Sequence, residues 1–156
     1  MSNIELVRQS KRITDLFSKT SAASTTDPEL QAHWARYLCI LISGFLENSI
    51  ELLYSEYSKK TSSPPVYRYV TKQLDRVTNP NEDVIVQIAG SFDNDWRVKL
   101  QDFLDSDGRK EAINGIVYTR NQIAHGRDTG ISIVILKGYF TKAVAVIDFI
   151  EKQLGI

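Results

Sequence analysis

The sequence predicts an all-α protein, a single-domain helical bundle of about six to seven helices with one long central helix. Apolar residues recur at spacings of three and four through most of the chain, which is the period of one helix face. Helix start and stop signals divide the chain into segments of helical length. With 156 residues, of which 42% are hydrophobic and 24% charged, the chain suits one globular domain over residues 1–156.

The first half of the chain predicts a short helix and then the long one. Apolar residues between Ile4 and Phe17 form an imperfect helical stripe, and the polar run 18–26 predicts a loop or a frayed helix end. The triplet Asp27-Pro28-Glu29 is a strong start signal, because Asp accepts hydrogen bonds from free helix amides and Pro has no amide to leave unpaired. The apolar stripe that follows predicts one helix over about 28–59, the scaffold of the fold.

Shorter helices follow the long one. The segment 61–65, which reads TSSPP, ends the long helix, and a short helix over 66–77 stops at Asn79-Pro80. Asn81 is a candidate N-cap for another helix, which we expect to end at Gly90.

The last third of the chain predicts three more helical segments. One spans 93–104 and stops at the turn residues 105–108. The next has its apolar side over 112–124 and ends at or just after His125, because Gly126 suits a left-handed C-cap. The β-branched run 130–135 is compatible with an extended segment, and a last helix begins at Leu136.

Composition excludes several classes of protein. Lys+Arg and Asp+Glu both number 19, so the net charge of zero does not indicate a non-specific DNA-binding protein, and nucleic acid would need a local patch. Cys39, the only cysteine, lies in an apolar run and is predicted to be buried, which fits a reducing cytoplasm. We find no secretory signal and no apolar run near the ~18 residues that span a bilayer, so we expect a soluble cytoplasmic protein without a membrane partner.

One short segment, YTRNQIAHG over Tyr118–Gly126, concentrates residues that can carry chemistry. Arg120 offers a planar fork of donors to phosphate oxygens, and Asn121 can orient a hydroxyl or an imidazole. His125 can take or give a proton near neutral pH. On a straight helix, however, Asn121 and His125 are ~40° apart, whereas Arg120 and His125 are ~140° apart, so the spacing permits a shared site without requiring one.

The charge around this segment is mildly basic. Between 109 and 127 the basic residues are Arg109, Lys110, Arg120 and Arg127, and the acidic one is Glu111, which gives a local charge of +3 (four minus one). This charge suits a phosphate backbone, so we predict that Arg109, Lys110 and Arg127 bind nucleic acid beside Arg120, Asn121 and His125; the family resemblance described below implies that this nucleic acid is RNA. A second interpretation stays open, because histidine is also common at the end of an ordinary helix, where it suits the helix dipole.

Neither a metal site nor a nucleotide cofactor is predicted. The other histidine, His33, lies next to Trp34 and is expected to be structural or exposed. Glu47 and Glu51 share a helix face but are too few to bind a metal, and we expect them to be solvated or paired with an arginine, with Arg120 as one option for Glu47. No Gly-rich phosphate loop is present, so no cofactor is expected.

The motif and its surroundings resemble a known family. Arg120–His125 is similar to the R-[polar]-x(3–5)-H motif of the HEPN superfamily, and the stretches TRNQIAHGRDTGIS and LCILISGFLENSIELLYSEY resemble the group called RiboL-PSP-HEPN, over about 30–155. Some HEPN members carry an acidic residue four positions before the basic pair, whereas the corresponding positions here are Gly115 and Ile116.

The resemblance implies an α-helical homodimer that acts as a metal-independent endoribonuclease, often as a toxin or defence effector. It also implies RNA as substrate, Arg120 and His125 as the catalytic pair, Asn121 as their supporting residue, and an antitoxin or regulatory protein as a further partner. Because catalysis has been lost in some HEPN domains, the alternative is a non-catalytic α-helical module that binds RNA, a nucleotide or a protein. A purely structural subunit is a third possibility if the chain is monomeric.

Overall fold

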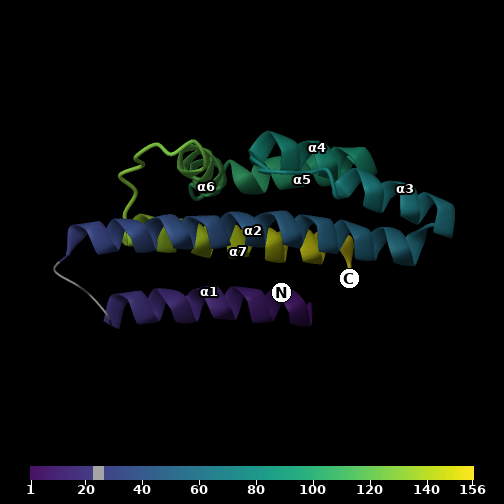
Figure 1. Ribbon diagram of the computed structural model, residues 1–156. Coiled ribbons are helices and arrows are strands. Elements are labelled where there is room, and N and C mark those ends of the chain that lie inside the picture. Colours follow the sequence, from purple (N-terminus) through teal and green to yellow (C-terminus); the bar gives the residue numbers. More distant parts are fainter. Residues whose placement is uncertain (23–26) are drawn as a thin grey trace.

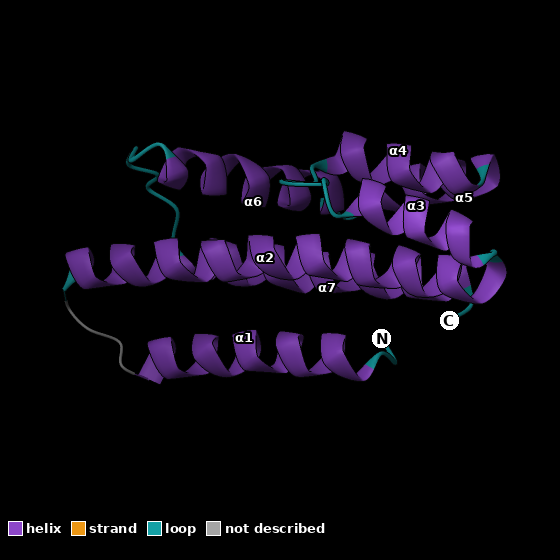
Figure 2. Ribbon diagram, turned by 45° about the vertical axis from the view of Figure 1, so that its right-hand side comes forward, coloured by secondary structure: helices purple, strands orange, loops and turns teal. Residues whose placement is uncertain are grey.

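The computed structural model describes residues 1–22 and 27–156, and in this part of the chain every regular element is an α-helix (Figure 2). The all-α prediction is therefore confirmed. The seven helices of the described residues are α1 (Ile4–Ala22), α2 (Pro28–Thr61), α3 (Pro64–Leu74), α4 (Glu82–Phe92), α5 (Asn94–Leu104), α6 (Arg109–Ala124) and α7 (Ile133–Leu154).

Helices α2 and α7 lie side by side and run in the same direction through the middle of the bundle (Figure 1). Helix α1 packs on one side of this pair, and α3 to α6 form the layer on the opposite side (Figures 1 and 2). Helix α6 contacts both α2 and α7, so the motif-bearing helix rests directly on the central pair.

Helix α2 supplies the scaffold that its sequence predicts. Asp27 caps it by accepting hydrogen bonds from the backbone amides of Glu29 and Leu30, as the start signal indicates. Its fully buried face follows the three- and four-residue spacing and includes Leu38, Cys39, Ile42, Leu46, Ile50 and Leu53. Burial of each large aliphatic side chain contributes about 1.5–3 kcal/mol, so this face accounts for much of the stability of the bundle.

By length and composition α2 is also apolar enough to cross a membrane, contrary to the expectation from sequence. However, 56% of the apolar window is buried inside the bundle, and a core helix gives the same pattern. The apolar character of α2 is therefore weak evidence for a membrane span.

Several predicted boundaries differ from the structure. Pro64 and Pro65 begin α3 instead of ending the previous break, because proline is well tolerated in the first turn of a helix. The run 133–135 is helical, because the Ser132 hydroxyl accepts a hydrogen bond from the Ile135 amide at 3.2 Å and caps α7. After Phe17 the loop alternative is wrong as far as Ala22, because α1 continues to that residue, and residues 23–26 lie outside the described part.

Gly90 is not a helix end, because α4 continues to Phe92 and is capped by Asp93. A Cβ atom at position 90 would lie 2.8 Å from Cδ of Arg97, so the glycine allows α5 to pack closely against α4. The prediction that this helix ends at Gly90 is therefore wrong.

The start of α6 is fixed by a buried carboxylate. Glu82 is 3% exposed and accepts hydrogen bonds from Nε2 of Gln101 at 2.8 Å and Nζ of Lys110 at 2.9 Å. Its backbone amide donates to Oδ1 of Asn114 at 3.0 Å. These contacts join α4, α5 and α6, and thereby set the direction in which α6 carries the motif.

Candidate functional site

The motif lies at the C-terminal end of α6, where the chain leaves the helix by a left-handed turn. His125 is the C-cap, and Gly126 follows with φ of 67°. The Gly126 amide donates to the carbonyl of Ile123 at 3.0 Å, and the Arg127 amide donates to the carbonyl of Gln122 at 2.9 Å. This pair of bonds is a Schellman motif, and it confirms the predicted role of Gly126.

Arg120 points toward α2. One turn earlier, the carbonyl of Ile116 accepts a hydrogen bond from Sγ of Cys39 on α2 at 3.7 Å, so this side of α6 faces that helix. Burial raises the pKa of the Cys39 thiol to about 12, and the positive charge of Arg120 opposes this rise. Arg120 is therefore half-buried along the seam between α6 and α2.

Asn121 and His125 lie on the outward side of the same helix end. The side chain of His125 is exposed and that of Asn121 half-buried, and the Asn121 carbonyl accepts a hydrogen bond from the His125 amide at 3.1 Å. Because α6 stays helical through Ala124, Arg120 remains ~140° from the His125 position around the axis. Within one chain the structure thus brings Asn121 and His125 to one side and turns Arg120 to another.

The polar groups of these side chains are available to a ligand. Arg120, Asn121 and His125 form no side-chain hydrogen bond or ion pair with any residue that the structure describes. Glu47, considered as a partner of Arg120, instead accepts a hydrogen bond from the Asn79 amide at 2.8 Å. A half-buried guanidinium without a carboxylate is suited to bind an anion.

The predicted RNA-binding residues fall at two places. Arg127 is exposed immediately after the motif, and its Nη1 donates to Oε1 of Gln122 at 3.2 Å. Arg109 and Lys110 lie at the other end of α6, about 16 Å from Arg120 along the axis. The +3 charge of the segment is therefore divided between the two ends of the helix.

Arg109 and Lys110 also have partners of their own. The Arg109 guanidinium lies 4.0 Å from the ring centroid of Phe103, and it donates to the carbonyls of Phe103 and Ser106. Lys110 forms an ion pair with the buried Glu82. Both cations hold the start of α6 in place, so an RNA strand would have to extend along the whole helix to reach them.

Three residues near the motif were missed by sequence reasoning. Nη2 of Arg36 on α2 donates to Oδ1 of Asp128 in the loop after the motif, at 2.6 Å, but 92 positions separate the two and no local signal joins them. Tyr118 is 66% exposed and lies seven residues before His125, hence on nearly the same side of α6. The seven-residue spacing could have identified Tyr118 from sequence.

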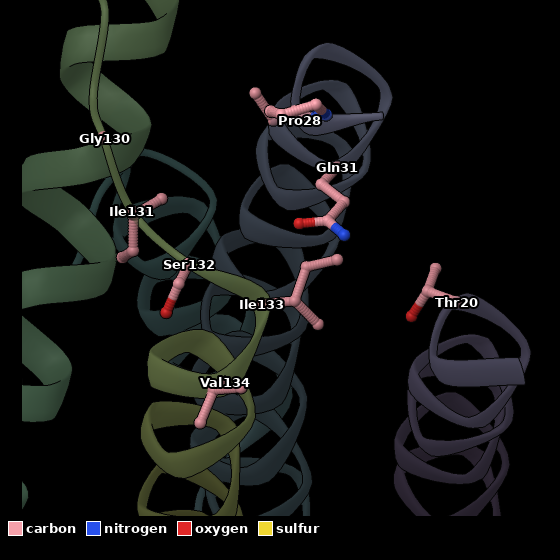
Figure 3. Close-up of a pocket in the computed structure, with 9 residues that line it drawn as sticks. Thr20, Pro28, Gln31, Gly130, Ile131, Ser132, Ile133 and Val134 are labelled. Carbon is pink, nitrogen blue, oxygen red and sulfur yellow. The ribbon is translucent and has the colours of Figure 1, made fainter. Parts of the chain in front are cut away.

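A cavity of 490 Å³ lies beside the loop that follows the motif (Figure 3). Its walls come from the start of α2, the end of the loop, the first turn of α7 and Thr20 of α1. None of its lining residues is charged, so a phosphate would find no cation there. The cavity lies beside the loop after the motif, and no residue of the motif lines it.

Comparisons with known proteins give one match. The family model described as RiboL-PSP-HEPN matches residues 4–155. No curated protein and no solved structure matches the chain.

Proposed function

Because the chain belongs to the RiboL-PSP-HEPN family, we propose that it is a metal-independent endoribonuclease that acts in the cytoplasm as a homodimer, as a toxin or defence effector. One observation carries this proposal. The exposed imidazole of His125 and the guanidinium of Arg120 lie at one helix end, and neither is paired with a described residue. The residue types are those that phosphodiester cleavage requires.

The reaction we propose is attack of an RNA 2′-hydroxyl on the adjacent phosphorus. A base removes the hydroxyl proton as the new P–O bond forms, and an acid protonates the 5′ oxygen as the old P–O bond breaks. The products are a 2′,3′-cyclic phosphate and a 5′-hydroxyl. His125 serves as acid or base, Arg120 stabilises the charge on the phosphorane oxygens, and Asn121 orients the imidazole or the substrate.

The separation of Arg120 from His125 supports a dimeric site. A two-fold axis near the ends of α6 would set Arg120 of one chain opposite His125 of the partner subunit. It would also provide two histidines, one for each proton transfer, whereas a single chain has one in the motif.

The first test is RNA cleavage in EDTA by the wild type, His125→Ala and Arg120→Ala, with analysis of the product ends. We expect cyclic phosphate and 5′-hydroxyl ends, and a loss of about 10²-fold or more in each variant. His33→Ala is the matched control, because His33 is the other histidine, lies on α2 and has a 62% exposed side chain. Normal cleavage by a folded Arg120→Ala protein would remove Arg120 from the proposed site.

A mixing experiment tests whether the site is shared between chains. If each site needs Arg120 from one chain and His125 from the other, subunit exchange between the two inactive variants restores about a quarter of wild-type activity, since half of the dimers are mixed and each keeps one intact site. If one site uses both histidines, the mixture stays inactive although each variant still forms a dimer.

The alternative is a non-catalytic module that binds RNA, a nucleotide or a regulatory protein such as an antitoxin. The half-buried position of Arg120 against α2 favours it, because this guanidinium is turned away from the exposed side that carries His125. A folded wild-type dimer that binds RNA but cleaves no member of a broad RNA panel would support the module.

A further inference from the structure

The ion pair between Arg36 and Asp128 joins α2 to the loop that follows the motif. Nη2 of Arg36 lies 2.6 Å from Oδ1 of Asp128, and the side chains are 35% and 89% exposed. Asp128 lies three residues after His125, just beyond the Schellman turn. In Figure 1 the loop between α6 and α7 passes the first half of α2, where Arg36 lies.

Arg36 is a neighbour of the seam that holds Arg120. It lies three residues before Cys39, and residues at this spacing on a helix have Cβ atoms about 5–6 Å apart. Cys39 contacts α6 through the carbonyl of Ile116, and its thiol is influenced by the charge of Arg120. Arg36 therefore lies one helical turn from the residue at which α2 contacts α6, and Arg120 lies one turn beyond that contact on α6.

The two arginines differ in their pairing with carboxylates. Asp128 pairs with Arg36, whereas Arg120 forms no ion pair with a described residue. A phosphate accepts hydrogen bonds from the planar fork of a guanidinium as a carboxylate does, so the fork of Arg36 that binds Asp128 is also suited to bind a phosphate.

We propose that Arg36 binds a phosphate of the RNA substrate and that Asp128 occupies Arg36 until RNA displaces it. The proposal rests on the ribonuclease function proposed above and adds a residue of α2 and a competing anion to that site. Displacement of Asp128 costs little, because an ion pair with so exposed a carboxylate contributes little to stability, and the freed carboxylate becomes fully hydrated. In the absence of RNA, the Asp128 carboxylate thus occupies the side of Arg36 that the substrate phosphate would bind.

The test measures the binding of a 2′-O-methyl RNA oligonucleotide, which cannot be cleaved by 2′-hydroxyl attack, by fluorescence anisotropy in EDTA at several salt concentrations. Arg36→Gln should weaken binding about tenfold and lower the slope of log K against log salt by about 0.7, the value for one single-strand phosphate contact. Asp128→Asn should strengthen binding about two- to fivefold. In the Arg36→Gln background Asp128→Asn should have no further effect, because the carboxylate acts through Arg36.

The opposite changes in RNA affinity expected for Arg36→Gln and Asp128→Asn distinguish this role from a structural one. If the ion pair only held the loop in place, both variants would break the same contact and both would weaken RNA binding. Lys11→Gln and Asp15→Asn are the matched controls, because Lys11 and Asp15 form an exposed ion pair of 3.0 Å on α1, across the bundle from α6 (Figure 1). We expect neither control to change RNA affinity more than twofold.

Four results would overturn the inference. Weaker binding by Asp128→Asn would show a structural role, and equal tightening by Asp15→Asn would show a general effect of net charge. Wild-type affinity and cleavage in Arg36→Gln would remove Arg36 from the site, while the loss of cleavage in His125→Ala would still support the ribonuclease. If the wild type does not bind 2′-O-methyl RNA but still cleaves unmodified RNA in EDTA, the inference fails and the ribonuclease function stands.

Discussion

Replacement of Gly126 by alanine tests the turn that presents His125. Gly126 has φ of 67°, and a Cβ atom there would meet nothing within 4 Å, so the cost of alanine is conformational and not steric. An L-residue in the left-handed region costs about 1–2 kcal/mol, and the smaller freedom of alanine in the unfolded chain offsets about 0.4–1 kcal/mol. We therefore expect Gly126→Ala to lower the free energy of unfolding by about 1 kcal/mol, which corresponds to about 2–4 °C in Tm for a chain of this size.

Gly138→Ala is the matched control, because a Cβ atom there also meets nothing within 4 Å but the residue lies inside α7 at negative φ. The same chemical change should raise the free energy of unfolding by about 0.5–1 kcal/mol. Thermal denaturation measures both variants, and cleavage below both Tm values should fall only in Gly126→Ala, where His125 is displaced. Gly126→Asn should recover part of the stability, because asparagine tolerates this region. A Gly126→Ala protein at or above the wild-type Tm would refute the left-handed cap.

Three further predictions each concern one residue. A Cβ atom at Gly115 would lie 2.6 Å from Cε2 of Tyr139, so Gly115→Ala should cost about 1–3 kcal/mol of unfolding free energy in denaturant titrations, and much less in a Tyr139→Leu background. Burial by itself raises the pKa of Glu82, but hydrogen bonds from Gln101 and Lys110 outweigh it and hold the pKa below its ordinary value of 4.5. The carboxylate therefore stabilises the fold above pH 4.5, and this stabilisation is lost as the pH falls below that value. In urea titrations, the free energy of unfolding should fall less for Glu82→Gln than for the wild type between neutral and acidic pH. Tyr118→Ala should weaken binding of 2′-O-methyl RNA by about 1–3 kcal/mol if a base stacks on this exposed ring, whereas Tyr118→Phe should bind as the wild type does.

Local chemistry explains which parts of the fold the sequence predicted. The caps at Asp27, Asn81 and Gly126 were correct, because each depends on hydrogen bonds to amides or carbonyls within a few residues. Gly90 was interpreted as a helix end, but its role depends on Arg97 of the neighbouring helix. A glycine that packing between helices requires cannot be told from a helix end by the residues around it in the sequence.

The residues of the candidate site also separate into those that local sequence predicts and those that only the folded chain brings together. The cluster of Arg120, Asn121 and His125 could be found from sequence, because its members lie within six residues. The count of positive charges around it was less informative, since a count does not show that Lys110 is paired with a buried carboxylate. The contact of Arg36 with Asp128 required the three-dimensional structure, because α2 and the loop after α6 meet only in the folded chain.

The spacing of the motif itself favours a site built from two helix ends. Residues that cooperate on one face of a helix are three, four or seven apart, as Asn121 and His125 are. Arg120 and His125 are five apart, which places them on different sides of any regular helix. The Arg120 side chain is half-buried beside α2, and a side chain confined in this way loses less conformational freedom when a phosphate binds. A spacing that is unfavourable within one chain becomes useful when a second α6 brings its own histidine to that guanidinium.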